Sequence, residues 1–306
     1  MPRRRPTTAP DLAELLTSWE LHLRAERKSP QTVKTYGDGV RAYLRWCVDN
    51  DRPPTLDRNG LKQFTVDLLD NGGRPATAVS RHLALRRFSG WLADEGELDA
   101  DPLAGLKAPK LDQPLTQPLT DAELKAMLNA CRGTAMRDYR DAAIVRLMYT
   151  TGARAGEVVA LEVDDVHARA NPPYVVIKRG KGGKGRTVPL APEVALAIDR
   201  YLRKGRTGHL LASSPALWLG DRGKGFTYDA LHKTLKYRAE LAGVAGFHPH
   251  RLRHTAAHRW LEKGGSEGGL MAVAGWTRPE MLLRYTRARA GERAAEEARR
   301  LNLGEL

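Results

Sequence analysis

Apolar side chains recur at three- and four-residue spacing through four stretches of the first third of the chain, which predicts four amphipathic helices. The second of them opens with Ser29-Pro30, a typical helix start, and the third ends at Asn71-Gly72, a common C-terminal cap. The fourth covers residues 75–98 and is expected to keep four basic side chains off its apolar stripe: Arg81, His82, Arg86 and Arg87.

These four stretches predict a helical bundle over residues 9–105, after a basic disordered tail at residues 1–8. Residues 106–119 then break the pattern with three prolines. Because proline keeps a segment out of helices and central strands, we expect an interdomain linker here. A capping box at Thr120–Glu123 predicts that a new helix starts directly after this linker.

The second domain, residues 120–306, combines helical patterns with two short β-prone runs, Tyr174–Lys178 and Arg186–Leu190. The segment RGKGGKG between them is rich in glycine, which suits a hairpin turn. The whole pattern therefore predicts a mainly α protein. It would consist of an N-terminal helical bundle and a mixed, mostly helical domain with a small antiparallel sheet.

Composition narrows the range of functions. The 306 residues carry a net charge of +14, which points to a polyanionic partner and most simply to nucleic acid. Cys47 and Cys131 lack the spacing of a metal site or a disulfide framework, so we interpret each as a small buried apolar group. No signal segment follows the basic N-terminus, and no apolar run approaches the ~20 residues that cross a bilayer. We therefore expect a cytoplasmic protein with no membrane partner.

Two clusters of basic residues in the second domain are candidates for chemistry. In TTGARAGEV, Arg154 follows a helix stop, and Glu157 three residues later can pair with it. The alternative is a surface ion pair of little consequence. The hairpin KRGKGGKGR, residues 178–186, holds five cations and no acid. We favour contact with DNA for this hairpin over a merely solvated turn.

A third cluster is HPHRLRHTAAH, which begins at His248. Pro249 at a helix start places His250 and Arg253 one helical turn apart on the same side of the helix. Free backbone N–H groups and the positive end of the helix dipole favour an anion at the same place. The sequence therefore predicts an anion site that carries an imidazole and a guanidinium.

Two other interpretations of this cluster are less favoured. The overlapping pair His248 and Arg251 straddles the proline, and we do not expect it to share a face. A zinc site could use His250, His254 and His258, but the interleaved glutamate of zinc-binding helices of this kind is missing. The sequence also lacks a P-loop, a dinucleotide fingerprint and an acidic cluster suited to two metal ions, so we predict no cofactor.

Taken in order, TGARAGEV, RGKGGKGRTVPL, HRLRHT, AGW and Tyr285 strongly resemble the tyrosine recombinases, the family of phage integrases and Xer-like proteins. In that family an arginine box, a hairpin lysine, a His-x-x-Arg motif, a histidine or tryptophan and a nucleophilic tyrosine follow one another in this order. The resemblance covers most of the chain, because SPQTVKTYGDGVRAYLRW at residues 29–46 also looks like the start of the family's core-DNA-binding domain.

The resemblance implies a site-specific DNA recombinase that cuts and rejoins DNA through a covalent 3′-phosphotyrosine. A SAM-like N-terminal bundle and a catalytic domain would form a C-shaped clamp on double-stranded core sites. Self-association into a synaptic tetramer through the tail from about residue 290 is also implied, and an accessory directionality factor is left open. The protein would be bacterial or phage-encoded and nucleoid-associated. A type IB topoisomerase-like activity and a catalytically silent DNA-binding regulator remain the alternatives.

The resemblance also assigns roles to residues. Arg154 and Arg253 would hold the scissile phosphate with their planar guanidinium groups, and Glu157 would orient the first of them. Lys181 would protonate the 5′-oxygen leaving group, with Lys184 as its rival. The complete set of catalytic residues implied by the family is Arg154, Lys181, His250, Arg253, Trp276 and Tyr285.

Further DNA contacts are expected from basic residues of the hairpin and of the fourth helix: Lys178, Arg179, Lys184, Arg186, Arg81, Arg86 and Arg87. Trp276 stands where many members have histidine, but its indole N–H could still donate to a phosphate oxygen while its ring packs against the site. Two departures from the family pattern stand out. Ala256 stands where a larger apolar residue is common, and SEGGLMAVAG at residues 266–275 replaces a more leucine-rich helical stretch. Neither departure touches a catalytic position.

Overall fold

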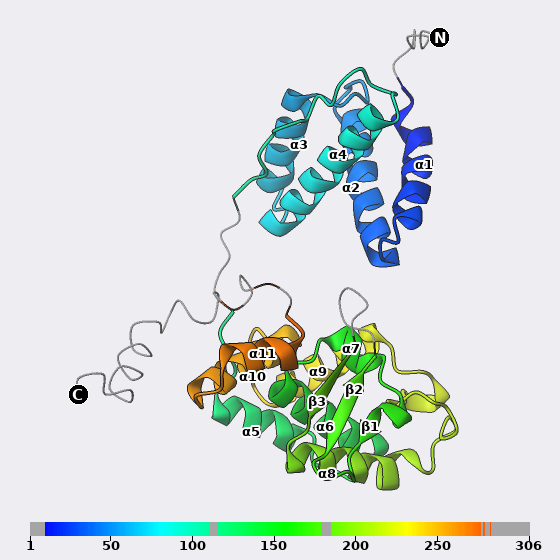
Figure 1. The fold of residues 1–306 in the computed structure, drawn as a ribbon. Helices are drawn as coiled ribbons and strands as arrows, with labels where there is room; N and C mark the ends of the chain where they lie inside the picture. The colour runs from blue at the N-terminus through cyan, green and yellow to red at the C-terminus, as the bar shows by residue number, and fades with distance from the viewer. Residues whose placement is uncertain (1–9, 111–115, 179–184, 277, 279–281, 283–306) are drawn as a thin grey trace, which may run out of the picture. The chain divides into compact units, whose positions relative to one another are not determined.

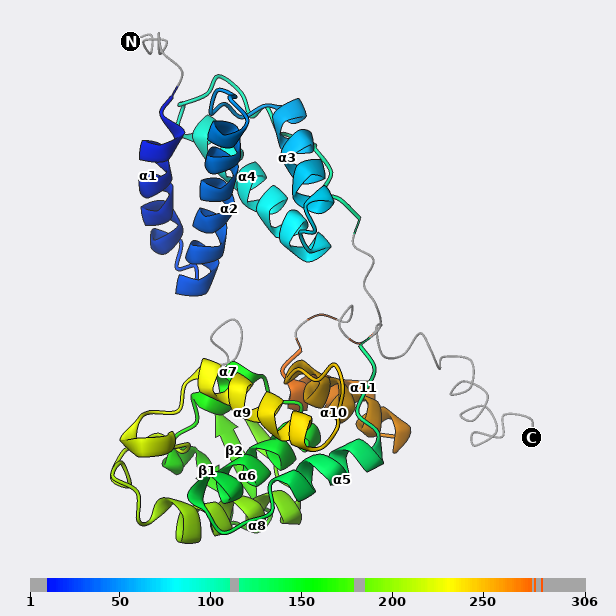
Figure 2. The ribbon, with the colours of Figure 1, turned by 180° about the vertical axis from the view of Figure 1, so that it is seen from behind.

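The computed structural model describes residues 10–110, 116–178, 185–276, 278 and 282. The chain divides into two compact units, Met1–Pro114 and Leu115–Leu306, and the division falls inside the proline-rich segment (Figures 1 and 2). No helix in the described ranges is both long enough and apolar enough to cross a membrane.

The first unit consists of four helices, α1 (Leu12–Ala25), α2 (Pro30–Asp49), α3 (Arg58–Asp70) and α4 (Pro75–Asp94). Local chemistry fixes their starts, because the side chains of Asp11, Ser29 and Asp57 accept hydrogen bonds from the first free backbone N–H groups of α1, α2 and α3. Proline stands at the first position of α2 and α4, where its missing N–H costs nothing. The predicted helical bundle is confirmed.

The core of this unit is aromatic. Trp19 of α1 is 1% exposed, and its ring lies 5.9 Å from Tyr36 and 5.1 Å from Phe88. Helices α2 and α4 approach closely, since a Cβ atom added at Gly39 would lie 2.7 Å from the Cβ atom of Ala84. Glycine is therefore required in α2 by packing, despite its cost to an isolated helix.

One expectation for α4 is wrong. His82 was expected to lie off the apolar stripe, but the structure buries it to 4% exposure. The reason is that α4 packs against α1, α2 and α3, so more than one narrow stripe of it is covered. Burial lowers the pKa of His82 more than the Leu106 backbone raises it, and the positive charge of Arg86 lowers it further.

The second unit is mostly helical. Its α-helices are α5 (Asp121–Ala130), α6 (Met136–Thr151), α7 (Ala155–Val159), α8 (Pro192–Arg200), α9 (Tyr228–Leu241), α10 (His250–Glu262) and α11 (Glu267–Ala274). Two short 3₁₀ turns, Val163–Asp165 and Asp221–Gly223, and a π-helical turn, Tyr201–Arg206, complete the helical segments among the described residues. The predicted capping box forms at the start of α5, where Thr120 and Glu123 bond each other's backbone N–H groups.

A three-stranded antiparallel sheet accompanies these helices, with strands β1 (Val166–His167), β2 (Tyr174–Ile177) and β3 (Arg186–Pro189) in that order. Strands β2 and β3 pair from Tyr174 with Pro189 to Ile177 with Arg186, which confirms the predicted strand pair. Strand β1 was not predicted, because two residues are too few to show the alternation of a strand.

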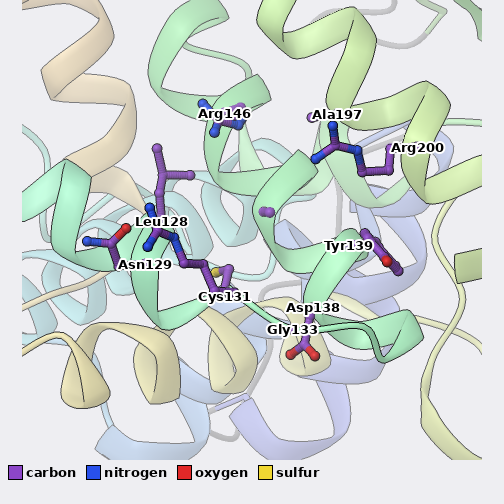
Figure 3. Close-up of a pocket in the computed structure, with 11 residues that line it drawn as sticks. Leu128, Asn129, Cys131, Gly133, Asp138, Tyr139, Arg146, Ala197 and Arg200 are labelled. Carbon is purple, nitrogen blue, oxygen red and sulfur yellow. The ribbon is translucent and has the colours of Figure 1, made fainter. Parts of the chain in front are cut away.

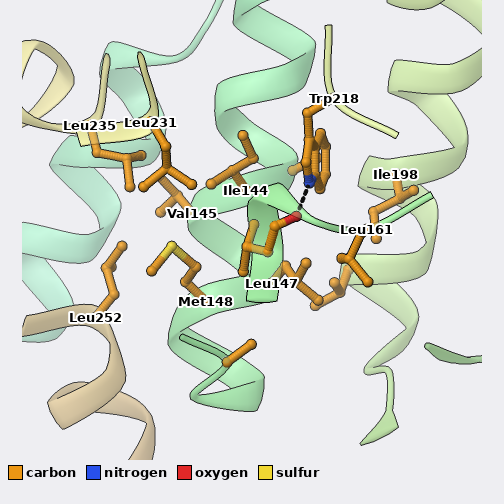
Figure 4. Close-up of a cluster of buried hydrophobic side chains, with 14 of the residues drawn as sticks. Ile144, Val145, Leu147, Met148, Leu161, Ile198, Trp218, Leu231, Leu235 and Leu252 are labelled. Atoms are coloured by element: carbon orange, nitrogen blue, oxygen red, sulfur yellow. Dashed lines mark hydrogen bonds between the residues drawn. The ribbon is translucent and has the colours of Figure 1, made fainter. Parts of the chain in front are cut away.

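Helix α6 forms the centre of the larger core (Figure 4). Ile144 and Leu147 of this helix are at most 1% exposed, and they share the cluster with Trp218. The Trp218 indole N–H donates to the carbonyl oxygen of Val158 at 2.8 Å, which ties the end of α7 to the core. This packing fixes the position in which α6 ends and the next turn begins.

A buried ion network also joins α6 to α9. Asp141 is 1% exposed and accepts hydrogen bonds from Arg140 Nε at 2.9 Å and from Arg238 Nε at 2.8 Å. Arg238 Nη2 also donates to Asp138 Oδ1 at 2.8 Å. Two guanidinium groups and two carboxylates thus compensate each other, as burial of charge requires.

The ends of the predicted linker pack on their own units. Leu106 packs against the core of the first unit, whereas Leu119 is 4% exposed within the core of the second. The backbone N–H of Leu119 donates to Thr255 Oγ1 of α10 at 2.8 Å, and Arg251 Nε donates to the Gln117 carbonyl at 3.1 Å. Helix α10 therefore holds the segment that enters the second unit.

Candidate active site

The turn between α6 and α7 carries the first candidate residue. Helix α6 ends at Gly152 with a φ of 64°, a conformation that favours glycine. Arg154 then stands at the N-cap of α7, where its backbone N–H donates to Glu157 Oε2 at 2.8 Å. Its Nη1 donates to Glu157 Oε1, also at 2.8 Å, so the predicted pairing of these two residues is present.

The Arg154 side chain has a second anchor. Its Nη2 donates to the carbonyl oxygen of Gly275 at 2.9 Å, and the side chain remains 29% exposed. Gly275 caps the C-terminal end of α11, where the helix dipole favours a cation. These two side-chain hydrogen bonds use two of the five N–H donors of a guanidinium, so Arg154 keeps donors for a ligand.

Arg186 has a different place from the one expected. It was predicted to contact DNA, but its Nη1 and Nη2 donate to Glu157 Oε1 and Oε2 at 3.0 and 2.8 Å. Its Nε donates to the Val273 carbonyl of α11 at 2.9 Å, and its side chain is 12% exposed. All three guanidinium nitrogens therefore donate hydrogen bonds within the protein. This bonding favours a structural role for Arg186 over a surface contact with DNA.

Glu157 is the shared partner of both arginines. Its side chain is 4% exposed, and burial by itself would raise the pKa of the carboxyl group. The hydrogen bonds from Arg186 and from the Arg154 backbone outweigh this effect and hold the pKa of Glu157 below its ordinary value. Glu157 is therefore a carboxylate at neutral pH, and it carries the one negative charge between two guanidinium groups.

Arg253 of α10 belongs to the same cluster. It is 2% exposed, its Nη1 donates to the Gly152 carbonyl, and its guanidinium carbon lies 5.4 Å from the centroid of the Trp276 ring. Gly152 is two residues before Arg154, and Trp276 follows the Gly275 that Arg154 binds. The structure thus brings Arg154, Arg253 and Trp276 together from distant parts of the sequence.

Trp276 is 5% exposed and packs with Leu261 and Leu270 in a small apolar cluster. This burial supports the expectation that its ring packs against the site. The small size of Ala256 also has a local reason, since its Cβ atom would lie 3.4 Å from a Cβ atom at Gly152. The α6–α7 turn and α10 are therefore in close contact at these two residues.

His250 is the first residue of α10 and is exposed, as a group that meets a ligand should be. Its ring lies 4.8 Å from that of His254 at an angle of 82°. The rival pair is separated: His248 is exposed, whereas Arg251 is 9% exposed and donates to the carbonyl oxygens of Gln117 and Ala245. Arg251 therefore has a structural role in holding the chain around α10.

The histidines of α10 do not gather as metal ligands. His258, the third member of the stripe, lies 3.3 Å from Glu262 of the same helix. Among the residues that the structure describes, no group of three or more histidine, cysteine, aspartate or glutamate side chains is arranged to hold a metal ion.

Lys178, at the base of the hairpin, is also held within the protein. Its Nζ lies 2.7 Å from both Glu162 Oε2 and Asp165 Oδ1. The hydrogen bonds that Lys178 donates to Asp165 and Glu162 raise its pKa above the ordinary value, so the side chain stays charged. Its side chain is 56% exposed, and the ion pairs anchor it at the end of β2.

Several predicted residues lie outside the described ranges: Arg179, Lys181, Lys184 and Tyr285. Arg81, Arg86 and Arg87 belong to α4 of the first unit, where Arg87 is exposed and the other two are half-buried. The signal for the Arg186 interaction is weak in the sequence, because its partner Glu157 lies on a different element and 29 positions away. Gly275, just before Trp276, was likewise not recognised as a residue of the site.

A separate hollow of about 290 Å³ lies among α5, α6 and α8, with Cys131, Arg146 and Arg200 among its lining residues (Figure 3). None of the residues that line it belongs to the group of Arg154, Glu157, Arg186, Arg253 and Trp276. The hollow is therefore separate from the candidate active site.

Comparison with known proteins agrees with this geometry. Residues 117–292 match the model of the "Phage integrase family", and residues 16–96 match that of the "Phage integrase, N-terminal SAM-like domain". The tyrosine recombinase XerD of Lacticaseibacillus casei is 31% identical over 82% of this chain and 85% of that protein. The tyrosine recombinase XerC of Chromobacterium violaceum is 35% identical over 82% of this chain and 81% of its own length.

Solved structures share the fold. The XerH recombinase in a post-cleavage complex with a palindromic difH substrate aligns with a TM-score of 0.70 at 20% identity, over 94% of this chain and 83% of that one. A lambda integrase tetramer bound to a Holliday junction aligns with a TM-score of 0.67 at 16% identity, over 89% of this chain and 76% of that one. The chain therefore belongs to the phage integrase family and is a tyrosine recombinase, an enzyme of site-specific DNA recombination.

Proposed function

We propose that this recombinase binds double-stranded core sites and cleaves each strand with Tyr285 as the nucleophile. The observation that carries the proposal is that Arg253 donates to the carbonyl oxygen of Gly152, in the turn that carries Arg154, while Arg154 is anchored by the carbonyl oxygen of Gly275. Two fixed guanidinium groups at one place suit a phosphodiester, whose negative charge lies on two non-bridging oxygens.

The reaction we propose is a transesterification. The phenolate oxygen of Tyr285 bonds to phosphorus, the bond from phosphorus to the 5′-oxygen breaks, and a 3′-phosphotyrosine forms. A tyrosine of pKa about 10 is ionised in only about one part in a thousand at pH 7. Arg154 and Arg253 favour both the phenolate and the charge that builds up on the phosphate oxygens, and His250 assists removal of the phenolic proton.

The leaving 5′-oxygen must gain a proton when its bond to phosphorus breaks. We assign this proton to Lys181 of the β2–β3 hairpin and keep Lys184 as the rival. The anchoring of Lys178 by Glu162 and Asp165 supports proton donation by a lysine of this hairpin, because it fixes the base of the hairpin at the end of β2. A single Lys178→Ala change would then slow the proton donation indirectly.

Assembly on DNA is also part of the proposal. The two units would enclose the duplex as a C-shaped clamp, with Arg81, Arg86 and Arg87 of α4 and Arg179 of the hairpin on its phosphates. Synapsis would use a tetramer, as in the lambda integrase complex with a Holliday junction, through the tail from about residue 290. Removal of the residues after 290 should abolish strand exchange and synapsis. If both survive this truncation, the tail is not the coupling element.

A nicked duplex tests the catalytic assignment. The duplex is selected by the wild-type protein from a random-sequence pool and nicked beside the cleavage position, so that cleavage becomes irreversible. We expect a covalent adduct with the wild type, none with Tyr285→Phe, and formation at least about 10²-fold slower with Arg253→Ala. The dissociation constant for the same DNA should change little, since phosphate contacts elsewhere supply most affinity.

Two outcomes would contradict the proposal. An adduct of normal yield with Tyr285→Phe would place the nucleophile elsewhere. Relaxation of supercoiled DNA without any exchange between two sites would instead favour the topoisomerase-like activity.

A further inference from the structure

We propose that Arg186 is a positioning residue of the reaction, which keeps Arg154 directed at the scissile phosphate and keeps its charge available. The inference rests on the proposed function, in which Arg154 binds that phosphate. Arg186 itself does not meet the DNA, because its three guanidinium nitrogens bind Glu157 and the end of α11.

The first step of the argument is the charge balance. Each oxygen of Glu157 receives one hydrogen bond from Arg154 and one from Arg186. The three side chains together carry one net positive charge. Without Arg186, the carboxylate would neutralise Arg154 alone, and the pair would attract a phosphate much less.

The second step is geometry. Arg186 donates hydrogen bonds to both carboxylate oxygens of Glu157 and to the carbonyl oxygen of Val273. Arg154 donates to Glu157 and to the carbonyl oxygen of Gly275, which is two residues after Val273. Strand β3, helix α7 and the C-terminal end of α11 are therefore fixed to each other through one carboxylate. Fork-shaped pairing of this kind sets the direction of both guanidinium planes.

Gly275 supplies the third step. Its φ is 65°, and a Cβ atom there would lie 2.7 Å from Arg186 Nη1 and 2.8 Å from its guanidinium carbon. A side chain at this position would push Arg186 out of its place. The glycine before Trp276 is thus explained by its positive φ together with the space that Arg186 occupies at the end of α11.

Single-turnover cleavage of the nicked duplex tests the inference. The duplex carries either a normal scissile phosphate or a neutral methylphosphonate in its place. Arg186→Met should slow cleavage of the normal substrate by about 10²-fold. The loss of rate caused by Arg186→Met should be several-fold smaller on the methylphosphonate than on the normal substrate. The reason is that the neutral linkage carries less negative charge for Arg154 to stabilise during cleavage. Arg154→Ala should show the same pattern.

A second variant separates electrostatics from lost structure. Glu157→Gln combined with Arg186→Met removes the carboxylate that would otherwise neutralise Arg154, so the double variant should cleave the normal substrate about tenfold faster than Arg186→Met alone. Arg169→Met is the matched control. It breaks two hydrogen bonds to Asp199 from a side chain that is 78% exposed, and it should leave cleavage unchanged.

The outcomes distinguish this inference from the proposed function. If wild type forms no adduct, the proposed function fails first. If wild type cleaves and Arg186→Met cleaves equally fast, or is slowed equally on both substrates, Arg186 is not a positioning residue for Arg154. If Arg186→Met does not fold, Arg186→Lys is the second variant, because it keeps the positive charge but loses the paired hydrogen bonds of a guanidinium to both oxygens of Glu157. It should show a loss of about tenfold that also shrinks on the methylphosphonate, and no loss at all would overturn the inference.

Discussion

At the scale of single residues, Glu157 and His82 show two ways in which a buried ionisable side chain is accommodated. Glu157 is compensated by two arginines, and its depressed pKa means that it stays charged throughout the neutral range. His82 represents the other case, since burial lowers its pKa and favours the uncharged ring. The two residues should therefore respond to pH in different ranges.

His82 makes the first unit sensitive to mild acid. Its pKa in the folded protein is below the unfolded value of about 6.5, so the unfolded chain binds the proton more tightly. The stability that this residue contributes is complete above about pH 6.5 and falls as pH falls towards the folded pKa, by at most about 1.4 kcal/mol per pH unit. Hydrogen exchange of α4 peptides in the full chain, corrected for the intrinsic pH effect, should show this loss between pH 7.5 and 5.5.

His82→Leu is the variant that isolates the effect, because it keeps the buried position uncharged and cannot titrate. Its α4 peptides should lose less protection than those of wild type over the same pH range. Identical pH dependence in the two proteins would show that His82 does not sense the acid.

At the scale of elements, the contact between α2 and α4 depends on one glycine. Gly39→Ala should destabilise the first unit by about 1–3 kcal/mol, because the new methyl group would meet the Ala84 side chain at 2.7 Å. Gly90→Ala of α4 is the matched comparison, since the added methyl group would have only Asp101 Oδ2 nearby, at 3.8 Å. That change should stabilise by about 0.5–1 kcal/mol through helix propensity. Urea unfolding measures both, and equal effects would refute the close contact.

The limits of sequence interpretation also lie at this scale. Helix starts were predictable from local chemistry, as at Ser29-Pro30 and Thr120–Glu123, because a cap needs only its own neighbours. Strand β1 was not, because its two residues are fixed by pairing with β2 and not by any pattern of their own. His82 was misplaced for a related reason, since the number of helices that cover α4 is a property of the packed bundle.

The same distinction applies to the site. The pairing of Arg154 with Glu157 was predictable, because three residues separate them along one turn. The hydrogen bonds of Arg186 to Glu157 were not predictable, because the two residues are 29 positions apart and meet only where strand β3 lies beside α7. The family resemblance supplied the order of the motifs, whereas the positive charge of the hairpin was the reason for expecting Arg186 to contact DNA.

At the scale of the whole molecule, the net charge of +14 should govern DNA binding. Replacement of Arg81, Arg86 and Arg87 by alanine should weaken binding to all sequences alike. It should also reduce the steepness of log K against log salt by roughly 2–3, since each phosphate contact contributes about 0.9. Arg169→Ala, which removes an exposed arginine already paired with Asp199, should leave the slope unchanged. An unchanged slope in the triple variant would remove α4 from the DNA interface.

The identity of the nucleophile is the claim on which the mechanism depends. The most direct measurement is mass spectrometry of the wild-type adduct with the nicked duplex, after digestion of both protein and DNA. We predict a nucleotide joined through its 3′-phosphate to Tyr285, and to no other tyrosine of the chain. A nucleotide attached to another residue, or cleavage that leaves no protein-linked DNA at all, would contradict the account.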